Sequence, residues 1–156
     1  MFLEMKKYLI ILFTISSFAI SKAQTNLEYL KLEKFNTDTL EYLRQNFIQN
    51  KQKYIGKEFN YLLKDLEIPI KSYRPDISDL KYIYIPKTSF LSYSFIEAGM
   101  RKDPRIKYWN VTIEWSHPLL FDSIMRLAYK SKYAWAEDDR KYFGRQIIGN
   151  IDLTQW

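Results

Sequence analysis

The stretch 105-RIKYWNVTIEWS-116 decides the fold, because apolar and polar side chains alternate along it with a period of two. The large apolar side chains occupy the odd-numbered positions Trp109, Val111, Ile113 and Trp115. The positions between them hold Tyr108, Asn110, Thr112, Glu114 and Ser116. A period of two is typical of a strand with one buried face and one wet face. We therefore predict a strand whose odd-numbered side chains point into the core.

A second alternating run, SFLSYSFIEA at 89–98, precedes this strand, and the turn AGMRKDP separates the two. Two such runs around a turn predict an antiparallel hairpin. The side chains predicted to point inward from the first run are Leu91, Tyr93 and Phe95. Shorter strands are predicted at 70–74 and at 80–85, and Pro86 is expected to end the second of them. The tail 145–156 predicts an edge strand through Ile147, Ile151 and Leu153.

Helical spacing of apolar residues marks the segments before the strands. Asp38 followed by Glu41 is a capping-box pattern that begins a helix, and Gly56 can end it through a positive φ. The apolar face of this helix is Leu40, Leu43, Phe47 and Ile48. A second helix is predicted from Lys57 to Pro69, with an inner stripe of Phe59, Leu62, Leu63 and Leu66. Residues 26–36 are predicted to form a short helix or an ordered lead-in.

Two further helices are predicted after the strands. His117-Pro118 is expected to break the strand, and Leu120, Ile124, Leu127 and Ala128 then suggest a helix. A short helix at 137–144 begins with three acidic residues, which interact favourably with the helix dipole. This order predicts an α+β fold, in which N-terminal helices pack on an antiparallel sheet of about four to five strands. A C-terminal helical segment and an edge strand complete it.

Gly56, the stripe Leu62/Leu63/Leu66 and Pro69 lie within YIGKEFNYLLKDLEIP at 54–69, and meandering strands follow. This layout, over about half of the chain beyond residue 23, resembles the two-helix, three-strand design of small periplasmic proteins. The families concerned are the β-lactamase-inhibitor-like proteins and the outer-membrane-assembly lipoproteins. The chain departs from the lipoproteins because it has no cysteine for lipidation. The resemblance implies a non-catalytic, protein-binding role and transfers no functional residue.

The first residues have the pattern of a secretory signal peptide. Lys6 and Lys7 are followed by an uncharged, mostly apolar run at 8–20, and Ser21-Lys22-Ala23 places small residues before a cleavage site. A membrane-spanning helix needs about 20 apolar residues, so this run is short for a span. We therefore expect cleavage before Gln24, a single globular domain at 24–156, and a bacterial periplasmic or secreted location.

Composition excludes several classes of function. The chain has no cysteine, so it has no disulfide, thiolate nucleophile or cysteine-ligated metal. Its 13 Tyr, 10 Phe and 4 Trp instead supply material for a packed core. The formal charge of +6 falls to +4 without Lys6, Lys7, Lys22 and Glu4 of the leader. This mild charge, together with export, argues against binding to nucleic acid.

The sequence offers weak candidates for catalysis. His117 is the only histidine, so an ordinary zinc site is not expected. As a general base, His117 has Glu114, Asp122 and Ser123 nearby in sequence, although its place at a strand end also suits a polar residue at a turn. No motif for a cofactor is present, and we expect neither a cofactor nor a metal ion. The sequence therefore favours a non-catalytic protein, with a small secreted hydrolase that uses His117 or a carboxylate pair as the alternative.

The candidate binding residues lie at and beside the predicted hairpin turn. They are Arg101, Lys102, Arg105, Lys107 and Tyr108. Cations at an exposed turn can bind an acidic partner, but they also keep a sheet soluble and discourage edge pairing. We expect a protein or an envelope component as the partner. A peripheral protein drawn to anionic lipid by this basic hairpin is a further alternative.

Overall fold

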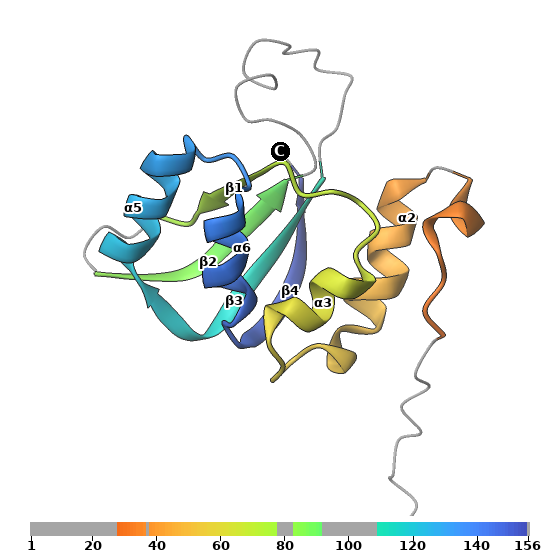
Figure 1. The fold of residues 1–156 in the computed structure, drawn as a ribbon. Coiled ribbons are helices and arrows are strands. Elements are labelled where there is room, and N and C mark those ends of the chain that lie inside the picture. The colour runs from red at the N-terminus through yellow and green to blue at the C-terminus, as the bar shows by residue number, and fades with distance from the viewer. Residues whose placement is uncertain (1–27, 37, 78–82, 92–108, 156) are drawn as a thin grey trace, which may run out of the picture.

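The computed structural model describes residues 28–36, 38–77, 83–91 and 109–155, and the fold in these residues is α+β (Figure 1). The strands are β1 Ser72–Pro75, β2 Tyr84–Leu91, β3 Trp109–Leu120 and β4 Ile148–Gln155. The helices are α2 Thr39–Leu43, α3 Phe59–Asp65, α5 Phe121–Ser131 and α6 Glu137–Gly144. The expected signal peptide, the predicted turn at 98–104, and Tyr93 and Phe95 lie outside the described residues.

The four strands form one antiparallel sheet in the order β1-β2-β3-β4. Helices α3, α5 and α6 lie on one face of this sheet (Figure 1), and their apolar side chains share a core with its inward residues. The predicted β2–β3 hairpin pairing is confirmed, and β4 is the predicted strand at the edge. Among the described residues, no helix lies over the opposite face of the sheet (Figure 1).

The predicted inward direction of β3 is confirmed where its side chains are described. Val111, Ile113 and Trp115 are buried and belong to the core cluster. The side chain of Trp109 lies outside the described part of the chain. Register explains the agreement, because Val111 lies opposite Phe90 on β2, and Ile113 lies opposite Thr88 and Ile151.

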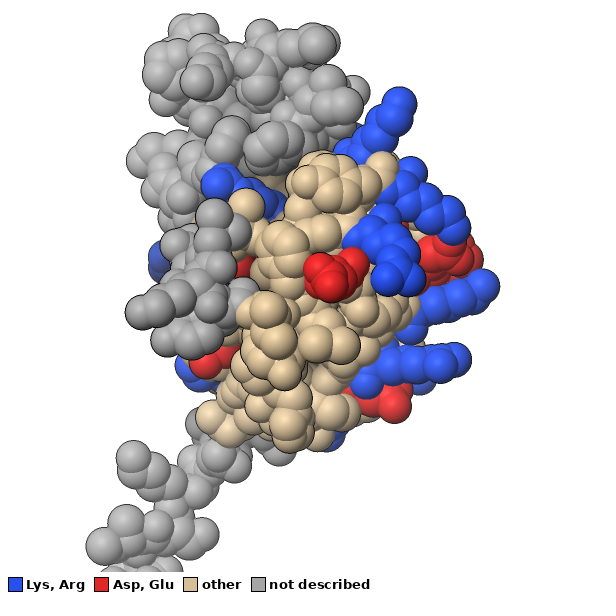
Figure 2. Space-filling model, turned by 90° about the vertical axis from the view of Figure 1, so that its left-hand side faces the viewer, with Lys and Arg blue, Asp and Glu red and all other residues tan. Residues whose placement is uncertain are grey.

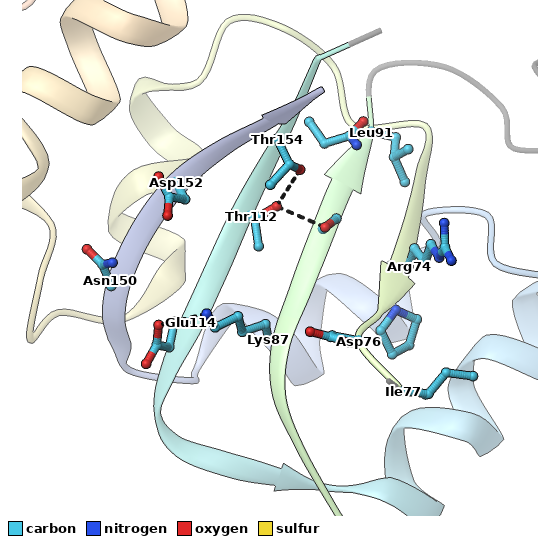
Figure 3. Close-up of a pocket in the computed structure, with 13 residues that line it drawn as sticks. Arg74, Asp76, Ile77, Lys87, Leu91, Thr112, Glu114, Asn150, Asp152 and Thr154 are labelled. Carbon is cyan, nitrogen blue, oxygen red and sulfur yellow. Dashed lines mark hydrogen bonds and ion pairs between the residues drawn. The ribbon is translucent and has the colours of Figure 1, made fainter. Parts of the chain in front are cut away.

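Leu91 is buried, with 2% of its surface exposed, but the prediction that it points inward is wrong. Phe90 packs in the core, whereas Leu91 lies opposite Asn110 and lines the other face of the sheet (Figure 3). A shift of one residue moves every side chain of a strand to the opposite face. The large ring of Phe90 decides the register, since it packs 4.6 Å from Phe59 and 6.2 Å from Trp115, measured between ring centroids.

Two prolines interrupt the pairing without ending their strands, contrary to prediction. β2 passes through Pro86, and the register with β3 shifts between Ile85 and Lys87. β3 likewise passes through His117 and Pro118 and pairs again with β2 at Leu119. Proline is tolerated in a sheet at such irregular positions, because no ladder hydrogen bond is required of its nitrogen there.

The predicted helix boundaries are largely confirmed. The Asp38 carboxylate accepts a hydrogen bond from the Glu41 N–H at 3.0 Å and caps α2, which continues as the π-helical turn Arg44–Gln49. Gly56 has a φ of 78° and separates this region from α3. The lead-in becomes a 3₁₀ helix at Leu32–Phe35. Within the described ranges, no helix is both long enough and apolar enough to span a membrane.

Candidate functional site on the outer face of the sheet

The face of the sheet turned away from α3, α5 and α6, which we call the outer face, carries a hollow of about 470 Å³ (Figure 3). All four strands or their ends contribute to it, because alternate residues of each strand point to the same side. Its lining residues are Arg74, Pro75, Asp76, Ile77, Lys87, Ser89, Leu91, Asn110, Thr112, Glu114, Asn150, Asp152 and Thr154.

Three hydroxyl groups form a chain across the middle of the outer face. Thr112 Oγ1 lies 2.9 Å from Ser89 Oγ and 2.9 Å from Thr154 Oγ1 (Figure 3). Each hydroxyl has one hydrogen to donate and two lone pairs. The two bonds of the chain use two of the three hydrogens, so one O–H hydrogen and several lone pairs stay available to a ligand.

Charged side chains flank this hydroxyl chain. Lys87 and Glu114 lie directly opposite each other on β2 and β3, with Nζ 3.3 Å from Oε2. Both side chains are almost half exposed, at 44% and 47%, and an ion pair this open to water contributes little stability. Glu114 and Lys87 can therefore give up their ion pair and bind groups on a ligand instead. On the next strand, Asp152 is exposed and lies opposite Thr112.

The lining suits a polar ligand better than an apolar one. Only Pro75, Ile77 and Leu91 are apolar, and the other lining residues are charged or carry hydroxyl or amide groups. Pockets for drug-sized molecules and cofactors are usually lined mainly by apolar and aromatic groups. The outer face instead offers donors and acceptors spread over three neighbouring strands. Among the described residues, no group of three or more His, Asp or Glu is placed to hold a metal ion.

The structure separates the residues that the sequence suggested for catalysis. Glu114 lines the hollow on the outer face. His117 is exposed on β3 and does not line the hollow, and Asp122 is exposed in the first turn of α5. The suggested binding residues Arg101, Lys102, Arg105, Lys107 and Tyr108 lie outside the described residues, so this proposal is still a prediction.

Sequence reasoning placed Asn110, Thr112 and Glu114 on one face but missed the partners that complete it. The missed residues are Lys87, Ser89, Asn150, Asp152 and Thr154. In β4 their signal was present, since Asn150, Asp152 and Thr154 alternate with Ile151 and Leu153. Although Asn110 and Thr112 belong to the outer face, they expose only 4% and 8% of their surface, because neighbouring side chains crowd them.

Comparison of the chain with family models, with curated proteins and with solved structures found no match. The functional proposal therefore rests on the geometry of the outer face.

Proposed function

We propose that this is an exported, non-catalytic binding protein that holds a polar ligand on the outer face of its sheet. The ligand is a segment of another protein or a polar component of the cell envelope. The observation that carries the proposal is the hollow of about 470 Å³, lined by the hydroxyl chain of Ser89, Thr112 and Thr154. It lies on the face opposite the helices, so a ligand can reach it without displacing the core.

The chemistry of the lining supports recognition of a hydrogen-bonding ligand. Hydroxyl groups both donate and accept, the carboxylates of Glu114 and Asp152 accept, and Lys87 donates. A rigid sheet fixes these groups before binding, which lowers the conformational entropy that the protein must lose when it holds a ligand. The arrangement favours an extended, polar ligand that lies across β2, β3 and β4.

A small secreted hydrolase is a second candidate because of one carboxylate pair. Glu114 lies opposite Asn150, so Glu114 and Asp152 are diagonal neighbours on β3 and β4. The Cα atoms of diagonal neighbours in a sheet are roughly 7–8 Å apart. Inverting glycosidases hold their two carboxyl groups about 6.5–9.5 Å apart, with a water between them. In this candidate, one carboxyl group protonates the leaving oxygen and the other activates the water.

Site-specific cross-linking tests the binding function. A photoreactive side chain replaces Asp152 on the outer face or, as a control, Lys141, which is exposed on α6. In cells that export the protein, we expect a discrete adduct from position 152 that excess unmodified protein suppresses, and no such adduct from position 141. Adducts from position 141 alone, or equal adducts from both positions, would contradict the proposal.

The hydrolase candidate separates from the binding function through turnover. Purified protein is incubated with soluble oligosaccharides and polysaccharides, and reducing ends are counted. Release that disappears in both Glu114→Gln and Asp152→Asn would establish the hydrolase. An adduct at position 152 without turnover would leave binding as the function.

A further inference from the structure

The large hydrophobic side chains that the described residues expose gather at one end of the molecule. Six such side chains are exposed in these residues, and five of them lie around the junction of β1, β2 and β3 with α5. We call these five the end patch: Ile77, Ile83, Tyr84, Leu120 and Tyr129. Ile83 is 68% exposed and Leu120 52% exposed. The sixth, Tyr61, lies on α3.

Backbone pairing and side-chain contacts place the members of the end patch beside one another. Tyr84 and Leu120 are directly paired across β2 and β3, and the Phe121 N–H donates to the Ile83 carbonyl oxygen at 2.8 Å. Ile77 lines a shallow apolar hollow of about 240 Å³ with Met125 and Tyr133. The ring of Tyr133 lies 6.4 Å from that of Tyr129 between centroids, so the patch continues along α5.

Lysine and arginine predominate among the exposed charged side chains of the helix layer, to which Tyr129 of the end patch belongs. From α5 to Arg145 the chain exposes six cationic side chains but only three acidic ones. The cations are Arg126, Lys130, Lys132, Arg140, Lys141 and Arg145. Two of them pair with acids of α6, Lys130 with Asp138 and Lys141 with Glu137. Figure 2 shows this end as a largely uncharged area that includes an acidic side chain, with Lys and Arg projecting along its helix-layer side.

We propose that the end patch docks the protein on an anionic lipid surface. Isoleucine and leucine side chains enter the boundary between headgroups and acyl chains, and the cations of the helix layer contact the anionic headgroups. Tyr84 and Tyr129 suit this depth, because a tyrosine ring is apolar while its hydroxyl group stays in water. The charge arrangement favours an anionic lipid surface, since cations outnumber acidic side chains along the helix-layer side of the apolar area. Ile77 also lines the hollow on the outer face, whereas the other four members of the end patch do not line it.

A fluorescent reporter at a single position tests the proposal in the full chain. The chain has no cysteine, so an environment-sensitive dye can be attached to Leu120→Cys, or to Tyr61→Cys as the matched control. Vesicles contain phosphatidylcholine alone or with phosphatidylglycerol. We expect the emission at position 120 to move to shorter wavelength with the anionic vesicles only, and position 61 to stay unchanged. The expected signal leader is present in both proteins and cannot produce this difference.

A substitution that places a negative charge in the end patch supplies the second readout. Ile83→Asp is expected to lower affinity for the anionic vesicles by about tenfold, and Tyr61→Asp to leave it unchanged, because Ile83 enters the lipid and Tyr61 does not. High salt should weaken docking as well. Equal responses at positions 120 and 61, or equal binding to both kinds of vesicle, would overturn the proposal. If the dye at position 120 does not respond to vesicles and a cross-linker at that position gives a protein adduct, the end patch is a protein interface instead.

Discussion

Tyr73 donates its hydroxyl hydrogen to the buried carboxylate of Asp139, with 2.8 Å between Oη and Oδ1. This bond joins β1 to the start of α6, and the other carboxylate oxygen accepts from the Ala136 N–H at 2.8 Å. Asp139 is only 1% exposed. A buried carboxylate needs its hydrogen bonds, because each one replaces water that burial has removed.

Tyr73→Phe should therefore lower the free energy of unfolding by about 2 kcal/mol, since it leaves one buried carboxylate oxygen without its donor. Urea titration of the single variants Tyr73→Phe and Asp139→Asn and of the double variant measures the coupling. We expect the double variant to lose less stability than the sum of the singles. Strict additivity would show that the hydrogen bond contributes nothing.

Buried tyrosines should make the protein sensitive to alkali. Burial raises the pKa of Tyr73 well above its usual value, and its hydrogen bond to Asp139 raises it further. Burial is likewise the main cause that raises the pKa of Tyr54 and Tyr29. Tyrosines of the unfolded chain lose their protons near pH 10, whereas these keep theirs when folded.

The stability that these groups contribute is thus complete below about pH 10 and is lost as the pH rises toward the folded pKa values. Above about pH 10, each such group makes the free energy of unfolding fall by about 1.4 kcal/mol more per pH unit, which corresponds to one proton. Urea titrations between neutral pH and strong alkali should show this decline, and Tyr54→Phe should make it shallower. A stability that stays constant across this range would contradict the assignment.

Asn46 fixes the segment that leads into the fold. Its fully buried amide accepts from the Leu30 N–H at 2.9 Å and donates to the Leu30 carbonyl oxygen at 2.8 Å. Asn46→Ala should cost about 2 kcal/mol and should speed hydrogen exchange at Leu30. The exposed Gln49→Ala is the control, and equal exchange in both variants would refute this role.

Thiol labelling can verify which way the sheet faces. Thr88 is completely buried and accepts from the Trp115 indole N–H at 3.1 Å, whereas Thr154 is exposed on the outer face. In the cysteine-free chain, Thr154→Cys should react with a maleimide at least about a hundredfold faster than Thr88→Cys, because labelling of a buried thiol waits for local opening. Faster labelling of Thr88→Cys would mean that the strands face the other way, and equal rates would mean that the sheet is open.

The sequence predicted the fold well where one period dominates a whole element. Val111, Ile113 and Trp115 are such a case, and so are the Asp38 cap and the turn at Gly56. It failed at Leu91, where both neighbouring parities offered apolar side chains and only packing of Phe90 decided between them. It also failed at Pro86 and Pro118, where the sheet tolerates proline through a shift of register.

The candidate site was harder to predict for a different reason. Ser89, Thr112 and Thr154 form one chain of hydroxyl groups, yet they come from three strands and are ordinary polar residues in the sequence. Their meeting depends on the register of two strand pairs, which local patterns do not specify. The same holds for Glu114 and Asp152, which become neighbours only through the pairing of β3 with β4.

The central claim is that the outer face binds the ligand, and protection of a thiol on that face tests it most directly. The partner captured at position 152 is purified, and maleimide labelling of Thr154→Cys and of Lys141→Cys is timed with and without it. At a partner concentration about ten times the Kd, labelling at position 154 should slow about tenfold, while labelling at position 141 keeps its rate. Unchanged labelling at position 154, with slower labelling at position 141, would contradict the account.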